Sequence, residues 1–74
     1  MIRLRPDLLR MANQIAANFA YLEAESAAPA VAAHLRHFWS PLMRAELVQG
    51  AGDAGLSPLA RAAAELLAAP AAGG

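Results

Sequence analysis

The sequence has no cysteine, no lysine and no net charge, because its six arginines are balanced by six carboxylates. Without cysteine there is no disulfide frame, no thiolate metal site and no thiol nucleophile. Neutrality argues against a dedicated nucleic-acid-binding protein, since such domains are usually strongly basic. No apolar run of about 18 residues is present, so no segment is expected to span a membrane. Arg10, Asn13 and Gln14 interrupt the apolar core that a signal peptide needs. A cytoplasmic location is therefore the default expectation.

The length limits this chain to one small domain. Its 74 residues leave no room for a second unit, since domains usually have about 100–200 residues. We expect a single helical domain over residues 1–74, ordered from about 7 to 68, with a flexible tail over 69–74. Of the apolar residues, which form 58% of the chain, 21 are alanines that bury little area. A chain this small buries only about 60% of its unfolded surface, so we expect marginal stability on its own.

Serine and proline residues predict where the helices begin. A serine N-cap followed by a proline in the first turn is a strong start signal, and it occurs at Ser40-Pro41 and Ser57-Pro58. Pro29 is expected in the first turn of another helix. With the hydrophobic spacing, these signals predict an all-α fold, a small bundle of three to four short helices over residues 7–22, 29–39, 41–49 and 58–68. Residues 23–28 are then a loop, and residues 50–55 a flexible turn segment.

Hydrophobic spacing also predicts which helix faces are buried. The first helix gathers a wide apolar face made of Leu8, Met11, Ala12, Ile15, Phe19 and Leu22. The fourth is expected to turn Arg61 and Glu65 outward and to bury Leu59, Ala63, Leu66 and Leu67. The third is apolar nearly all round, which requires cover on more than one side. We therefore expect more apolar helix surface than the interior can hide, and a partner chain that covers the remainder.

No combination of residues predicts a catalytic, cofactor-binding or metal-binding site. His34 and His37 share one side of a helix, but zinc needs three or four ligands and no cysteine is present. Ser40 and Ser57 act as helix caps, and no serine lies in a Gly-x-Ser-x-Gly elbow. The glycine-rich segment follows no strand, so it carries no phosphate-binding fingerprint. We expect a chain that is not an enzyme and that binds no cofactor.

Candidate partner-binding residues lie in two segments. The run Phe38-Trp39-Ser40-Pro41 is distinctive, because tryptophan is enriched among binding hot spots. We expect Phe38 mostly inside and Trp39 at the rim of an interface, although both aromatics can also fill the core. Asn13 and Gln14 form an amide strip that faces either water or a partner. The predicted partner-binding residues are Met11, Asn13, Gln14, Phe38, Trp39, Pro41, Met43 and Arg44.

Three segments carry a family resemblance. They are Leu-Arg-Met-Ala-Asn-Gln-Ile-Ala over residues 9–16, the stretch 31–44 with its Phe-Trp-Ser-Pro-Leu-Met-Arg ending, and Gly-Leu-Ser-Pro-Leu over 55–59. In this order and spacing, over residues 7–67, the chain resembles the delta subunit of soluble, molybdenum-containing, NAD-dependent formate dehydrogenases. Leu42 departs from the pattern, where a basic residue is expected, so a charge-based contact at that position is not predicted.

The resemblance implies a non-catalytic subunit. In that family, formate oxidation belongs to a large subunit with a molybdopterin cofactor and iron–sulfur clusters, and NAD reduction belongs to flavin-bearing partners. The resemblance further implies that the chain docks on the large catalytic subunit and supports assembly, stability or acquisition of the molybdenum cofactor.

Two alternatives stay open at the level of sequence. One is a self-associating helical protein whose apolar faces cover each other in a homodimer when the chain is isolated. The other is a small helical nucleic-acid-binding module, which the neutral charge disfavours.

Overall fold

Four α-helices form the part of the chain that the computed structural model describes, residues 4–69. They are α1 (Pro6–Asn18), α2 (Ala24–Phe38), α3 (Pro41–Gln49) and α4 (Pro58–Ala68). No strand occurs among these residues, so the predicted all-α bundle is confirmed. Ala69 ends α4 in an extended conformation, and the remaining predicted tail, 70–74, lies outside the described residues together with 1–3.

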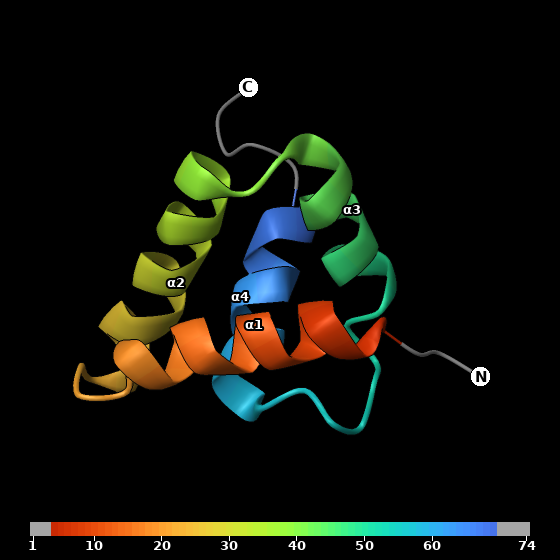
Figure 1. Cartoon of the computed structure of the whole chain (residues 1–74). Helices are drawn as coiled ribbons and strands as arrows, with labels where there is room; N and C mark the ends of the chain where they lie inside the picture. Colours follow the sequence, from red (N-terminus) through yellow and green to blue (C-terminus); the bar gives the residue numbers. More distant parts are fainter. Residues whose placement is uncertain (1–3, 70–74) are drawn as a thin grey trace.

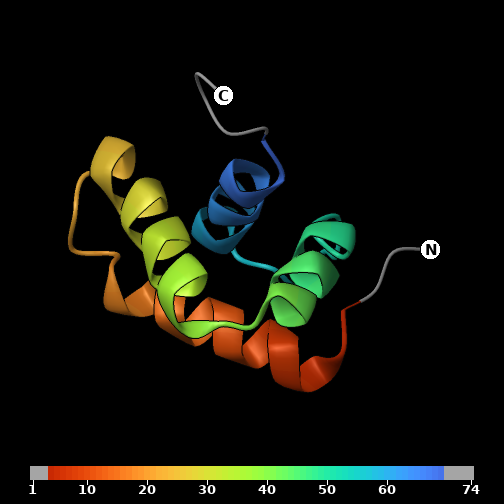
Figure 2. The same cartoon turned by 90° about the horizontal axis from the view of Figure 1, so that it is seen from above.

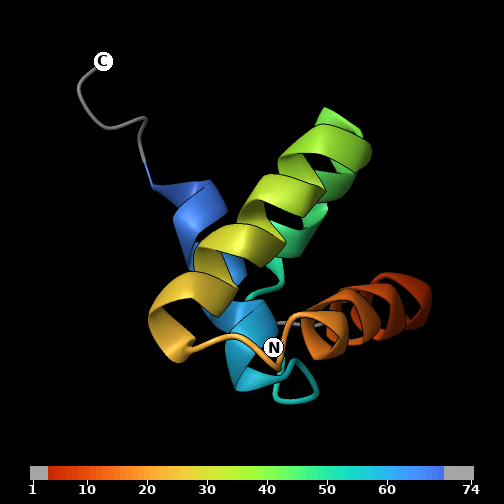
Figure 3. The same ribbon diagram turned by 90° about the vertical axis from the view of Figure 1, so that its left-hand side faces the viewer.

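Helix α4 lies at the centre of the bundle. It contacts all three other helices, and α2 most extensively. Figure 1 shows α1 across the bottom, with α2 and α3 rising on either side of α4, and Figures 2 and 3 show the same grouping from two further directions. The connection between α2 and α3 is consequently at the opposite end of the molecule from α1.

The centre of the core is made of alanine. The face of α4 that is buried consists of Ala60, Ala63 and Ala64, which allow neighbouring helices to approach closely. The prediction that the leucines of this helix point inward was wrong in part: Leu59 and Leu67 are half-buried, and Leu66 is 38% exposed. The larger core side chains come from the surrounding helices and loops: Leu4, Leu8, Val31, Leu35, Trp39, Leu47 and Leu56.

The loop between the first two helices is shorter than predicted. Helix α1 ends at Asn18, not near Leu22, and α2 begins at Ala24, not at Pro29. The carbonyl of Glu23 accepts from the backbone N–H of Ser26 at 2.9 Å and of Ala27 at 2.8 Å, which nucleates the helix before the proline. Pro29 is tolerated inside α2 because it lies close to the start, where its missing N–H removes a single helical bond.

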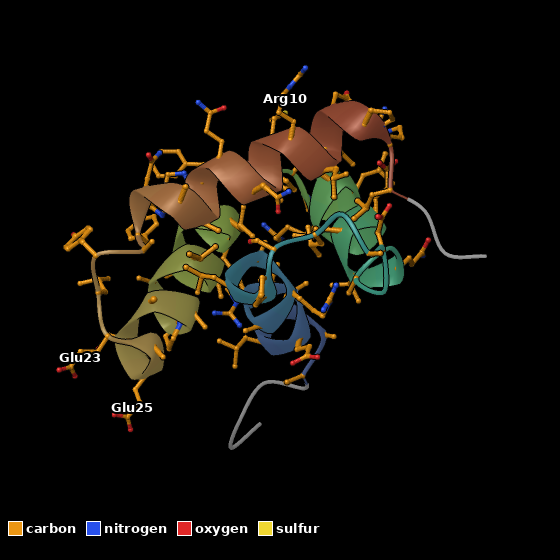
Figure 4. All side chains as sticks on the ribbon, turned by 90° about the horizontal axis from the view of Figure 1, so that it is seen from below. Arg10, Glu23 and Glu25 are labelled. Atoms are coloured by element: carbon orange, nitrogen blue, oxygen red, sulfur yellow. The ribbon has the colours of Figure 1, made fainter. Side chains whose placement is uncertain are left out.

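The new start of α2 also explains its two acidic residues. Glu23 is the N-cap and Glu25 lies in the first turn, where carboxylates are favoured by the helix dipole. Figure 4 shows both side chains pointing away from the protein. The sequence predicts both residues in the loop over 23–28, and the structure corrects this, because α2 begins five residues earlier than predicted.

The predicted helix starts at Ser40 and Ser57 are confirmed. The Ser40 hydroxyl accepts from the backbone N–H of Met43 at 3.2 Å, and the Ser57 hydroxyl accepts from that of Ala60 at 3.1 Å. Because each cap is followed by proline in the first turn, α3 and α4 have the predicted bounds. The segment that connects α3 to α4 runs from the end of α3 at Gln49 to the second of these starts, at Ser57.

That connecting segment is held by hydrogen bonds, contrary to the flexibility predicted for it. Asp53 accepts from the backbone N–H of Leu4 at 2.9 Å and of Gly55 at 2.8 Å. Arg61, predicted to point outward, donates instead to the carbonyls of Ala51, Asp53 and Leu56 at 3.1, 3.1 and 3.3 Å. At Gly50 a Cβ atom would overlap the Leu4 side chain, so glycine is needed for this close approach.

Candidate functional site

The corner between α2 and α3 reverses the expected roles of its two aromatic residues. Trp39 is 6% exposed and belongs to the core, whereas Phe38 is 69% exposed. Around the helix axis, Phe38 lies only about 20° from buried Val31. Helical spacing therefore predicts that Phe38 is buried too, and it could not reveal the exposure of this ring. The reason is tertiary, because the surrounding helices cover Val31, Leu35 and Trp39 and leave the last turn of α2 open on the side of Phe38.

The exposed ring of Phe38 is held between two histidines. Its centroid lies 4.7 Å from the ring centroid of His34 and 4.9 Å from that of His37. His34 in turn contacts Phe19 edge-on, at a centroid distance of 5.9 Å. Such aromatic pairs favour defined ring orientations. Phe38 therefore presents a large apolar group whose position is already restricted, as a binding hot spot requires.

Arg44 fixes the corner from the first turn of α3. Its Nη1 donates to the carbonyl of Arg36 at 3.0 Å and to that of Trp39 at 2.9 Å. Arg36 lies in the last turn of α2 and Trp39 is the C-cap, so neither carbonyl has a helical N–H as its partner. Met43 is half-buried against the core and Pro41 is exposed. Five of the eight predicted partner-binding residues are thus brought together at this corner: Phe38, Trp39, Pro41, Met43 and Arg44.

The three remaining predicted residues lie on α1, at the other end of the molecule. Met11 is 38% exposed, and Gln14 is exposed. Asn13 is half-buried and uses both ends of its amide inside the chain: Nδ2 donates to the Gly55 carbonyl at 2.9 Å, and Oδ1 accepts from the Ser57 N–H at 2.8 Å. The structure therefore does not join the α1 residues to the α2–α3 corner. Partner binding by Met11 and Gln14 stays a prediction.

Asn13→Ala is expected to lower the free energy of unfolding by about 1–3 kcal/mol, because it leaves the Gly55 carbonyl and the Ser57 N–H without their partner. Urea unfolding followed by circular dichroism measures the change. Gln14→Ala is the matched control, since this neighbouring amide is exposed and surface substitutions usually stay within about 0.5 kcal/mol. Equal stability of the two variants would contradict the structural role of Asn13.

An alanine-lined groove separates α1 from the start of α4. Its two adjoining cavities, of about 320 and 390 Å³, share Ala20, Pro58 and Leu59 as walls. None of the described residues that line the two cavities carries a charged side chain. This groove is apolar, but its walls give no indication of which molecule covers it.

The described part of the chain offers no metal centre and no membrane span. Among residues 4–69, no three His, Cys, Asp or Glu side chains are grouped so that they could hold a metal ion. In the same range, no helix combines the length and the apolar character needed to cross a bilayer.

The comparisons with known proteins give one result. A family model described as NADH-dependent formate dehydrogenase delta subunit FdsD matches residues 7–64. The matched stretch includes α1 from its second residue, α2, α3 and most of α4, and therefore all eight predicted partner-binding residues. No curated protein and no solved structure matches the chain.

Proposed function

This chain belongs to the family of NADH-dependent formate dehydrogenase delta subunits, and from this we propose that it is a non-catalytic subunit that docks on the large catalytic subunit of the complex. Docking supports the assembly and stability of the complex and the acquisition of its molybdenum cofactor. In this proposal the chain acts in the cytoplasm, within a soluble enzyme.

The observation that carries the docking proposal is the exposed Phe38 beside the buried Trp39. Phenylalanine is among the residue types that are most often fully buried, and aromatic residues are enriched where proteins bind one another. The family match covers this corner. The fixed contacts with His34 and His37 lower the entropy lost when Phe38 enters a pocket of the partner.

The mechanism is mass action. A subunit that binds only the folded, competent form of the large subunit raises the population of that form by an amount set by its concentration and affinity. No bond in formate has to be made or broken by this chain. Its residues bind and orient, and the partner subunits supply the chemistry.

Deletion of this chain is expected to reduce both the molybdenum content of the remaining complex and its formate-dependent reduction of NAD⁺ several-fold, because fewer large subunits reach the competent form. The measurements are metal analysis of the purified complex and the rate of NADH formation. Re-expression of the chain should restore both quantities. If neither changes on deletion, the assembly role is excluded.

A further inference from the structure

A second feature of the same end of the molecule is a cavity of about 410 Å³ among α2, α3 and α4. Arg36 and Arg44 form its polar wall together with Gln49, and Ala45, Val48 and Leu67 form an apolar wall. Figure 2 looks down on this end, where the carboxyl ends of α2 and α4 lie beside the start of α3. The cavity adjoins the Phe38–Trp39 corner, because Arg44 also donates to the carbonyl of Trp39.

Within the described range 4–69, the two arginines bind backbone carbonyls and no carboxylate. Arg36 donates from Nη2 to the Leu66 carbonyl at 3.2 Å, near the end of α4. Arg44 donates from Nη1 to carbonyls at the end of α2. The one ion pair found among residues 4–69 joins Arg5 and Glu46. A guanidinium has five N–H donors, so each of these arginines retains donors for another acceptor.

The net charge around the cavity is positive even when the partial charges of the nearby helix ends are added to those of the two arginines. Each helix C-terminus carries about −0.5 elementary charge, and two of them lie at this end of the bundle. The start of α3 adds about +0.5 and the two arginines contribute +2, so a net charge of about +1.5 is left. No aspartate or glutamate occurs anywhere between residues 30 and 45. The segment from residue 30 to residue 45 therefore supplies no carboxylate to this cavity, and the next one along the chain, Glu46, pairs with Arg5.

We propose that the Arg36–Arg44 cavity receives a carboxylate side chain carried by an apolar segment of the large catalytic subunit. This inference rests on the proposed function and adds the chemistry of the contact. Guanidinium groups bind carboxylates with paired, charge-assisted hydrogen bonds. The volume is far larger than one carboxylate, and the apolar wall requires neighbouring apolar groups on the same occupant. An acidic residue within an apolar segment can bind the arginines with its carboxylate while its apolar neighbours pack against the apolar wall.

The test measures the affinity of the full chain for the purified large subunit by isothermal titration calorimetry. Arg36→Gln and Arg44→Gln are each expected to weaken binding about tenfold or more, since a charge-assisted hydrogen bond is lost. Arg10→Gln removes the same charge from the outer face of α1, where the side chain points into solvent (Figure 4), and should leave the affinity within about twofold of wild type. Binding of the wild type should also weaken as salt is added.

Folding of each variant is checked by thermal unfolding, because Arg36 and Arg44 also cap helices. Arg36→Lys keeps the charge but loses the planar fork, so it should recover part of the affinity that Arg36→Gln loses. If the wild type does not bind the large subunit at all, the proposed function fails. If the wild type binds and the two glutamine variants bind like Arg10→Gln, only the carboxylate contact is excluded. Competition by acetate at millimolar concentration, without any effect of the variants on docking, would show a small free anion in the cavity and would also overturn the proposal.

Discussion

Trp39→Ala is expected to remove about 3–5 kcal/mol from the free energy of unfolding of the isolated chain. Truncation of a buried tryptophan costs this much because it combines lost burial with a cavity that neighbours cannot fill. Trp39 is 6% exposed and packs in the core cluster with Leu35 and Leu47. A chain of 74 residues has a total stability of only about 4–11 kcal/mol at the usual 0.05–0.15 kcal/mol per residue. The variant should therefore be largely or partly unfolded at 37 °C.

Circular dichroism at 222 nm, followed during heating and during urea titration, measures this loss without relying on tryptophan fluorescence. Trp39→Phe should keep most of the helical signal, because a smaller ring still fills part of the site. The matched comparison is Phe38→Ala, which removes an adjacent aromatic ring that is 69% exposed. If Trp39→Ala and Phe38→Ala unfold at the same temperature, the assignment of Trp39 to the core is wrong.

Phe38→Ala is expected to have the opposite profile, with a small effect on folding and a large one on docking. Loss of a central aromatic hot spot costs about 2 kcal/mol or more in binding, which corresponds to a roughly 30-fold higher Kd for the large catalytic subunit. Stability of the isolated chain should change by less than about 1 kcal/mol, because the ring is mostly in solvent already. Calorimetric titration and urea unfolding give the two quantities.

The control for Phe38 is Tyr21, an aromatic residue in the turn after α1 that is 81% exposed. Tyr21→Ala removes a ring of similar size from a different part of the surface, so it should leave the Kd within about twofold. Phe38→Leu should lie between wild type and alanine, since it keeps apolar volume but loses the ring contacts with His34 and His37. An unchanged Kd for Phe38→Ala would remove the corner from the docking surface.

Local sequence alone predicts the position of two of the four helices, α3 and α4. The bounds of α3 and α4 agree with prediction, because a serine cap and a proline in the first turn act within four residues of each other. Pro29 shows the limit of such local rules. Proline favours the first turn, but α2 starts five residues before it and loses the one hydrogen bond that the proline cannot donate. The acidic residues Glu23 and Glu25 were the signal for that earlier start.

Other assignments depended on contacts between segments that are distant along the chain. Asn13 bonds to Gly55 and Ser57 across 42 and 44 positions, so an amide that looks like part of a solvated strip holds α1 against the start of α4. Arg36 reaches Leu66 across 30 positions, which places it beside Arg44 in one cavity. Spacing rules describe residues within one helix, so they cannot predict contacts between residues that lie 30 or more positions apart in the sequence.

The sequence by itself determined that this protein is helical, where two of its helices begin, and which family it belongs to, since caps, prolines and motif residues act over short spans. Only the tertiary structure decided that Trp39 is buried and Phe38 is not, that alanines of α4 form the centre, and that two arginines share a cavity to which residues 4–69 contribute no carboxylate. The physical reason is that exposure is set by what neighbouring helices cover. That depends on how four short helices pack around α4, and the periodicity of each helix is compatible with more than one such packing.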